Sequence, residues 1–440
     1  MPDPARQPTV RKRQVFYLSG FDPRGAPFYR RLYRDEAAAQ ARVGGLDLAL
    51  GPRERDGEFA SRWRIATPGD ATVTDYAFLH WDDLIRRHWL RNELALIAAY
   101  LGVIWLGVRT GALFKVWRVS WPPGVAVTFP FVLLLLVLGL GVAAGMAAGD
   151  LAASAFTHAM TGLAAGAPAL PADAAATAFG SGSSGGGAWI GGPGARAAGL
   201  VAGLAVFAGV VQLGRLLEAR LRLYWLLRIY AFSIRLALGR LPGMEERIDA
   251  FARLLVERVR ASDADEVLIA AHSVGTIVAP MMLARALALD PDLARRGPRI
   301  SLLTLGQCIP MVSYIPQAAR IRADMAALAA AREIDWVDFT APVDGACFAL
   351  TDPLATSGIA QPDPAAPRPK LLSPRLPTLF TPATYRRIRR DWYRVHFQYL
   401  MASEKPATAP GAYDYFAITA GPQLLAERFA AKAAVRDWKR

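Results

Sequence analysis

The sequence predicts a mainly parallel α/β fold that is interrupted by a membrane-embedded α-helical hairpin. Strand-length apolar runs alternate with helix-like segments near both ends of the chain, which is typical of a parallel sheet covered by helices. Residues 125–148 carry no charge and are long enough to cross about 30 Å of hydrocarbon. The 440 residues are 53% hydrophobic and only 20% charged, a balance that also favours a membrane part.

The first soluble part, residues 1–93, reads as the beginning of the α/β domain. The run QVFYLS is rich in β-branched and aromatic residues and stops at Gly20, as a buried strand would. The segment predicts strands at 14–19, 63–67 and 76–81 and a helix at 26–39.

The membrane insertion spans residues 94–243. Its first apolar stretch is short and has arginines on both flanks, which favours a helix lying in the membrane interface over a span. The insertion is predicted to contain an interfacial helix (94–114), transmembrane helices (about 125–148 and 197–216), an external Ala/Gly-rich loop (149–196) and a juxtamembrane basic-aromatic helix (217–240).

Charge placement predicts the orientation of the hairpin. No Lys or Arg occurs from position 119 to 195, whereas Lys115 and Arg118 precede the first apolar span. Four arginines follow the apolar part of the second: Arg215, Arg220, Arg222 and Arg228. By the positive-inside rule, the external loop lies outside, and both termini and the α/β domain lie on the cytoplasmic side. We therefore expect a multi-pass protein of the inner (cytoplasmic) membrane.

Glycines recur every four residues in both predicted spans, at Gly141, Gly145 and Gly149 and at Gly199 and Gly203. Such small faces allow helices to approach closely in lipid. The first interpretation is packing within the hairpin, and the second is a homo-oligomer interface.

Composition limits the other partners. The net charge is 51 − 37 = +14, but the excess clusters beside the spans, so the lipid bilayer is a better partner for it than nucleic acid. Two cysteines, Cys308 and Cys347, and five histidines predict neither a disulfide framework nor a metal site. No phosphate-binding glycine loop is present, and no cofactor is expected.

The second soluble part, residues 244–440, continues the alternation of strands and helices. An amphipathic helix at 244–260 is followed by the apolar strand EVLIAA at 266–271. Further strands are predicted at 301–305 and 334–339, with helices from residue 275 and at 317–332 and a Pro-rich surface loop at 352–382.

One pentapeptide in this part carries chemistry. At Ala271-His272-Ser273-Val274-Gly275 an apolar strand ends, a small–x–Ser–x–small sequence follows, and a helix starts. This order is that of a nucleophile elbow, a sharp turn that exposes the serine hydroxyl above the sheet. The alternative interpretation is a serine that caps a helix after a core strand.

With these motifs, residues 14–93 and 244–440 resemble the α/β-hydrolase superfamily, in particular its serine esterases and lipases. The resemblance implies a triad in the chain order Ser, Asp or Glu, His. Of the five histidines, only His396 lies well beyond Ser273, so it is the expected base. Two features depart from the family pattern: Ala271 stands in place of the first glycine, and no Gly-rich oxyanion run is present.

The resemblance also implies the remaining site residues. The acid should follow the strand at 334–339, which favours Asp344, with Asp352 as the alternative, whereas Asp338 lies within the strand and points into packing or a hydrogen bond. The oxyanion hole would use the backbone N–H of Val274 and that of Phe21 or Gly20. Asp22 and Arg24 bind substrate or pair with each other.

These observations together predict a membrane-anchored serine hydrolase that cleaves a carboxylic ester, either a lipid or a small acyl ester, at the cytoplasmic membrane face. One alternative keeps the triad but acts as an acyltransferase or thioesterase. The other is a hydrolase fold that is retained as a catalytically inactive membrane scaffold.

Overall fold

The computed structural model describes residues 10–67, 72–166, 192–363, 366–406 and 411–435. The chain forms two compact units, the first from Met1–Val127 and Leu227–Arg440 and the second from Thr128–Leu226. The second unit is shorter than the predicted insertion at 94–243, because the helices at both ends of the insertion bury side chains such as Tyr100 and Tyr230 in the first unit.

The first unit is built on a mostly parallel β-sheet with the order β2-β4-β5-β1-β6-β7-β8-β9, and β3 pairs with β4. β1, β5, β6, β7, β8 and β9 are parallel to one another, while β2, β3 and β4 join by antiparallel pairing. The strands are β1 (Lys12–Leu18), β2 (Ala49–Leu50), β3 (Glu54–Asp56), β4 (Ala60–Thr67), β5 (Thr72–Leu79), β6 (Glu266–His272), β7 (Arg299–Leu305), β8 (Asp335–Phe339) and β9 (Lys370–Leu372).

All six predicted strands are present, but β2, β3 and β9 were not expected because runs of two or three residues carry no readable alternation. β9 lies inside the Pro-rich stretch 352–382, so the prediction of a loop there is wrong at Lys370–Leu372, which pairs with β8. Short helices also interrupt that stretch.

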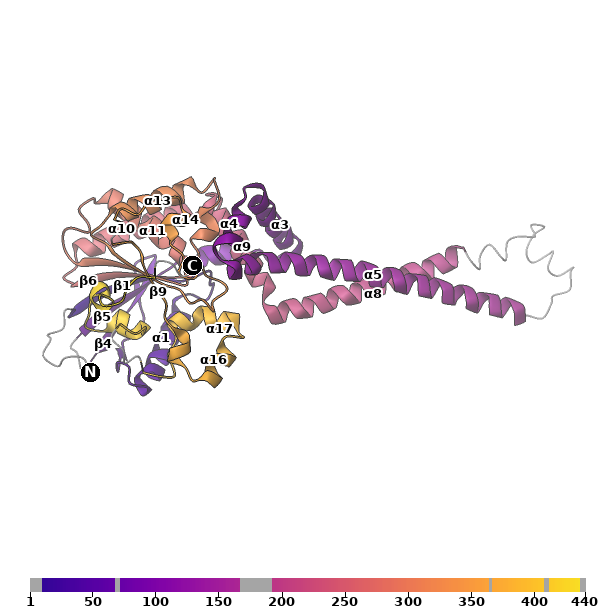
Figure 1. The fold of residues 1–440 in the computed structure, drawn as a ribbon, viewed down its shortest axis with the longest axis horizontal. Coiled ribbons are helices and arrows are strands. Elements are labelled where there is room, and N and C mark those ends of the chain that lie inside the picture. Colours follow the sequence, from indigo (N-terminus) through magenta and orange to yellow (C-terminus); the bar gives the residue numbers. More distant parts are fainter. Residues whose placement is uncertain (1–9, 68–71, 167–191, 364–365, 407–410, 436–440) are drawn as a thin grey trace. The chain divides into compact units, whose positions relative to one another are not determined.

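Helices cover both faces of the sheet. Figure 1 shows α10 (Met244–Arg260), α11 (Gly275–Leu289) and α13 (Ala319–Ala330) on one face and α1 (Gly25–Arg42) on the other. The amphipathic pattern of α10 puts Ile248, Phe251 and Leu255 in the core, as predicted. The shorter helices of this unit are α2 (Asp82–Arg87), α12 (Pro310–Ser313), α14 (Pro353–Thr356), α15 (Leu376–Leu379), α16 (Pro382–Ile388), α17 (Trp392–Phe397), η1 (Gln398–Leu400), α18 (Tyr415–Ala420) and α19 (Leu425–Arg428).

The predicted interfacial helix at 94–114 is a bent pair, α3 (Glu93–Arg109) and α4 (Ala112–Val119), with an angle of 81° between them. Gly111 lies between them with φ +71°, a left-handed conformation that glycine adopts without strain. Large apolar side chains such as Trp105 and Phe114 are about two-thirds exposed, at 66% and 68%. The predicted juxtamembrane helix is α9 (Leu223–Ala237).

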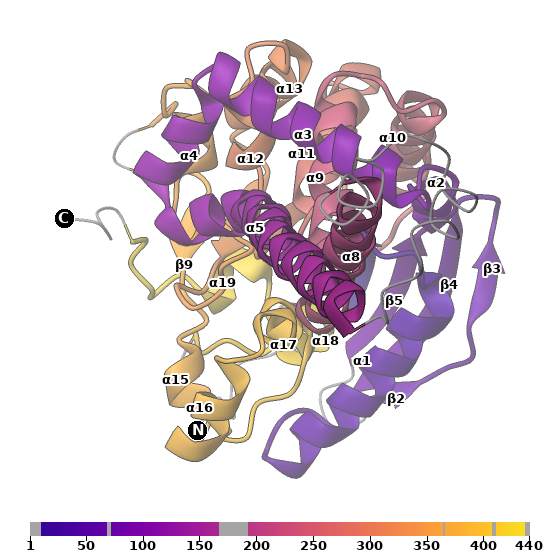
Figure 2. The same cartoon turned by 90° about the vertical axis from the view of Figure 1, so that its right-hand side faces the viewer.

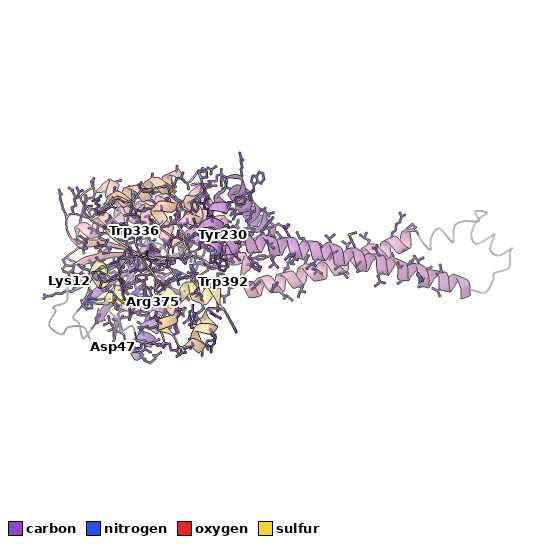
Figure 3. The ribbon with its side chains drawn as sticks, in the orientation of Figure 1. Lys12, Asp47, Tyr230, Trp336, Arg375 and Trp392 are labelled. Atoms are coloured by element: carbon purple, nitrogen blue, oxygen red, sulfur yellow. The ribbon has the colours of Figure 1, made fainter. Side chains whose placement is uncertain are left out.

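The second unit contains most of α5 (Trp121–Gly166) and of α8 (Pro193–Leu221), two helices long and apolar enough to cross a membrane. Apolar side chains project from both helices along their length (Figure 3). α5 extends beyond the predicted span 125–148, because Ala-rich residues up to Gly166 continue the helix where the external loop was expected. At 1.5 Å per residue it is about twice as long as the hydrocarbon is thick. The rest of that predicted loop, 167–191, lies outside the described residues.

Glycines mediate the contact between α5 and α8. A Cβ on Gly145 would lie 2.8 Å from the carbonyl oxygen of Gly203, and one on Gly149 would lie 2.9 Å from that of Gly199. Only glycine permits such an approach of two backbones. The geometry agrees with packing within the hairpin, and the second interpretation, a homo-oligomer interface, stays a prediction.

Candidate functional site

Ser273 occupies a strained turn between the fully buried strand β6 and helix α11. Its φ is +56°, in the left-handed region that non-glycine residues rarely adopt and that concentrates at functional sites. The Ser273 N–H donates to the carbonyl oxygen of Leu305, at 3.0 Å, which ties the turn to β7. The predicted strand–turn–helix order is therefore present.

Close backbone approaches explain the small residues around this serine. A Cβ on Gly275 would lie 2.5 Å from the carbonyl oxygen of Ser19, and a Cβ on Gly20 would lie 2.7 Å from the Cβ of Ser273. The segment after β1 thus passes directly over the turn, because β1 and β6 are neighbours and Leu18 pairs with Ala271. Ala271 is fully buried, so the fold accommodates a methyl group at this position.

The structure brings Ser273, His396 and Asp344 into one hydrogen-bonded chain. Because a carboxylate only accepts, His396 Nδ1–H donates to Asp344 Oδ2 at 2.9 Å, and Nε2 accepts from the Ser273 hydroxyl at 2.8 Å. All three residues are buried. Asp344 lies in the segment after β8, and His396 lies in α17, later in the chain. The three residues thus follow one another along the chain in the predicted order Ser, Asp, His.

Asp344 is held as a carboxylate. Its Oδ2 also accepts from the Tyr399 hydroxyl at 3.0 Å, and its Oδ1 accepts from the Ala346 N–H at 3.0 Å. Burial alone would raise the pKa of Asp344, but the facing His396 and these two donors outweigh it, so the pKa lies below its ordinary value. The alternative acid, Asp352, instead accepts from the N–H groups of Leu354 and Ala355 at the start of α14.

Two residues next to the hydrogen-bonded Ser273, His396 and Asp344 were not predicted as site residues from the sequence. His272 Nε2–H donates to the main-chain oxygen of His396 at 2.8 Å, and the two rings lie 4.9 Å apart between centroids. Burial lowers the pKa of His272 to about 3, so it stays neutral and adds no charge beside His396. Tyr399 is the second, and its only sequence signal is its position three residues after His396.

Gly306, which follows β7 with φ +58°, makes room for all of these groups. A Cβ there would lie 2.9 Å from the Tyr399 ring, and 3.4 Å from both Asp344 Oδ2 and His396 Cε1. A larger residue at this position would push His396 and Asp344 apart.

The predicted oxyanion residues lie beside Ser273. Val274 is fully buried just before α11, a 15-residue helix, and the N-terminal end of a helix carries a positive partial charge. Gly20 contacts Ser273 as described above. The Phe21 ring stacks on Trp89 with centroids 5.3 Å apart and contacts Phe232, which anchors the segment after β1.

Asp22 and Arg24 pair with each other. Arg24 Nε donates to both carboxylate oxygens of Asp22, at 2.8 and 2.9 Å, and Tyr29 donates to the same carboxylate. Arg24 Nη2 also donates to the Tyr393 hydroxyl in α17 at 2.8 Å. The pair therefore connects the segment after β1 to the helix that carries His396.

An apolar pocket borders the segment that carries Asp344. It includes Ala346, whose N–H donates to Asp344, and Met311, which follows Cys308 by three residues. The Cys308 thiol is buried against the Ser273 hydroxyl, and burial raises the pKa of this thiol to about 12. The remaining lining comes from α3, α4, the start of α5, α9, α12 and neighbouring segments: Val103, Ile104, Leu106, Gly107, Ala112, Leu113, Val116, Pro123, Val127, Tyr230, Ile234, Ile315 and Phe348.

The described residues contain no group of three or more His, Cys, Asp or Glu side chains that could hold a metal ion. The fold and site define a mixed α/β protein with a buried Ser–His–Asp arrangement and two apolar helices. Comparison with family models, with curated proteins and with solved structures finds no match for this chain.

Proposed function

We propose that the protein is a membrane-anchored serine hydrolase of the α/β-hydrolase type that cleaves carboxylic esters. The observation that carries this proposal is the chain from Ser273 Oγ through His396 to Asp344, with the serine in a strained turn at φ +56°. Side chains in this order activate a hydroxyl as a nucleophile.

In the proposed reaction, Ser273 Oγ attacks the ester carbonyl carbon while its proton moves to His396 Nε2. The N–H groups of Val274 and of Phe21 or Gly20 stabilise the oxyanion that forms. The carbon–oxygen bond to the leaving alcohol then breaks, and His396 returns its proton to that alcohol. Water, deprotonated by His396, then attacks the acyl carbon. The bond from that carbon to Ser273 Oγ breaks, His396 returns the proton to Oγ, and the carboxylic acid leaves. Asp344 stabilises the imidazolium in both halves of the reaction.

Labelling with a fluorophosphonate probe tests the activation of Ser273. We expect labelling of the wild type to disappear in Ser273→Ala and to persist in Ser61→Ala. Ser61 is the matched control because its hydroxyl also lies within hydrogen-bond distance of a histidine, His80, at 2.9 Å. Labelling that persists in Ser273→Ala, or a folded wild type that is not labelled, would contradict the proposal and favour the inactive scaffold.

The apolar pocket supports an acyl chain as part of the substrate, because its lining is almost entirely hydrocarbon and it borders the segment carrying Asp344. Ala112→Phe would fill the pocket from α4. We expect this variant to lower kcat/KM for an octanoate ester about tenfold and to leave an acetate ester unchanged. Phe114→Ala, at an exposed position on the same helix, is the control. An equal loss for both esters would argue against the acyl role.

The charge distribution supports a cytoplasmic location of the α/β domain and an external location of the segment between α5 and α8. Cysteines introduced at Ser183 and Ser262 test this topology with a membrane-impermeant maleimide, since the native Cys308 and Cys347 are buried. We expect Ser183→Cys to react in intact cells and Ser262→Cys only after lysis. The opposite pattern would reverse the orientation.

A further inference from the structure

A second pocket, which is polar and has a volume of about 400 Å³, lies at the edge of the sheet formed by β3 and β4. Figure 2 shows these two strands at the sheet edge, with α2 close to them. The pocket is lined by four arginines, three carboxylates, one histidine, one serine and one phenylalanine: Arg53, Arg55, Arg86, Arg247, Glu58, Asp82, Asp83, His80, Ser61 and Phe59.

The carboxylates of the pocket are mostly engaged. Asp83 accepts from both Nη1 and Nη2 of Arg247 at 2.8 Å. Asp82 accepts from Arg86 Nη1 at 2.6 Å and from His80 Nδ1–H at 3.3 Å. Among the carboxylates of the pocket lining, Glu58 is exposed and has no ion pair with an arginine within the described residues.

Arg53 and Arg55 keep most of their donors for a ligand. Arg53 Nη1 donates to the Ser61 hydroxyl oxygen at 3.2 Å, and Arg55 Nε donates to the Gly57 carbonyl oxygen at 3.1 Å. Neither guanidinium forms a salt bridge with a carboxylate within the part of the chain that the structure describes. Since a guanidinium has five N–H donors, each of these arginines retains several.

The arrangement around Ser61 favours binding over nucleophilic chemistry. The Ser61 hydroxyl donates to His80 Nε2, and its oxygen accepts from the Arg53 guanidinium. The positive charge of Arg53 makes this oxygen a poorer nucleophile. Ser61 also lies inside strand β4 and not in a strained turn. Arg53, immediately before β3, and Arg55, within it, offer several guanidinium N–H donors, and such donors suit the oxygens of phosphate.

We infer that this pocket binds a phosphate group through the remaining N–H donors of Arg53 and Arg55. The Ser61 hydroxyl oxygen, which accepts from Arg53 Nη1, helps to hold Arg53 in place. The inference is independent of the proposed esterase activity. Two sources share this chemistry, free phosphate and the headgroup of a phosphomonoester lipid. The second is within reach because α2, which carries Asp82 and Arg86, ends six residues before α3, whose apolar side chains are exposed.

Calorimetric titration of the detergent-solubilised full chain tests the inference, with inorganic phosphate and dihexanoyl phosphatidic acid as separate probes. We expect both probes to bind, and the double variant Arg53→Gln/Arg55→Gln to lose about tenfold or more in affinity, because charge-assisted hydrogen bonds are removed. Arg62→Gln is the matched control: this arginine is adjacent in β4 and exposed, and it is paired with Glu54. Arg55→Gln alone gives a smaller loss.

Tighter binding of the lipid than of inorganic phosphate would assign the pocket to a headgroup, and equal binding would assign it to free phosphate. No binding of inorganic phosphate, binding that survives the double variant, or an equal loss in Arg62→Gln would overturn the inference. Fluorophosphonate labelling of the same samples separates this outcome from the esterase proposal, since the double variant leaves Ser273 labelled.

Discussion

Two regions of the first unit hold Ser, His and Asp side chains in the same hydrogen-bond order. In the first, Ser273, His396 and Asp344 are joined at 2.8 and 2.9 Å. In the second, Ser61, His80 and Asp82 are joined at 2.9 and 3.3 Å. In both, burial opposes ionisation of the aspartate but its partners prevail, so the pKa of Asp344 and that of Asp82 are lowered.

The backbone distinguishes the two regions. Ser273 lies at φ +56° before a 15-residue helix, where N–H groups at the helix start can meet a developing negative charge. Ser61 lies in a regular strand opposite Arg55 and Phe78, and its oxygen already accepts from Arg53. The turn, and not the order of the side chains, therefore separates a candidate nucleophile from a candidate anion pocket.

The largest effect is expected from removing the two histidines in parallel. His396→Ala should lower kcat/KM for an octanoate ester by about 10⁴-fold, because Ser273 loses its general base. His80→Ala should leave kcat/KM within about twofold. Steady-state kinetics of both variants measures this difference, with thermal unfolding as the folding control. Equal inactivity of His80→Ala would mean that the two regions do not differ in their contribution to catalysis.

A smaller effect is expected from adding one methyl group in each region. Gly20→Ala should lower kcat by about 10²-fold, because its Cβ would lie 2.7 Å from that of Ser273 and shift the reacting oxygen. Gly57→Ala, at φ +69° beside the second region with open space around it, should cost about 1 kcal/mol of stability without changing kcat. A normal kcat for Gly20→Ala would show that this segment does not position Ser273.

A third comparison concerns the donors to the two carboxylates. Tyr399→Phe removes the hydroxyl that donates to Asp344 Oδ2, and we expect kcat to fall about tenfold with KM unchanged, since Asp344 then orients His396 less firmly. Arg86→Gln removes the corresponding donor to Asp82 and should change neither constant. A rise in KM for Tyr399→Phe would instead indicate a structural role in the pocket.

The sequence predicts the parts of the site that short linear patterns encode. Ser273 is visible because a buried strand, small residues and a helix start are adjacent in the chain, and His396 because it is the one histidine well beyond that serine. Asp344 follows from its position after a readable strand. The six strands and the two long apolar helices could be predicted for the same reason. Each is a continuous segment with a single hydrophobic pattern, either alternating or apolar throughout.

The rest depends on contacts between distant segments. His272 supports His396 across 124 positions, and Gly306 is required by groups that come from residues 344, 396 and 399. The second Ser–His–Asp group has no linear signature, because Ser61 meets His80 only through the pairing of β4 with β5. β9 and the break between α3 and α4 each involve only two or three residues. Segments this short show no hydrophobic periodicity, so the sequence does not predict them.

The last effect is on stability and not on catalysis, and it concerns a buried carboxyl that has no cationic or imidazole partner among the described residues. Asp338 in β8 accepts from the Thr304 hydroxyl at 2.6 Å, in agreement with the side-chain placement predicted for it, and burial raises its pKa to about 7. Its ionisation therefore opposes folding: the penalty is absent below the unfolded pKa of about 4, grows between pH 4 and 7, and is complete above pH 7.

Asp338→Asn keeps the acceptor for Thr304 but cannot ionise. We expect the variant to gain stability relative to the wild type as the pH rises from 5 to 8, by about 1–3 kcal/mol, or a few degrees in Tm. Asp82→Asn should show no such gain between pH 5 and 8, since a carboxylate with a lowered pKa stabilises the fold fully above its unfolded pKa of about 4 and loses this contribution only in more acidic solution. Thermal unfolding at both pH values measures the two trends, and parallel behaviour of the variants would mean that partners do not determine these two carboxyl pKa values.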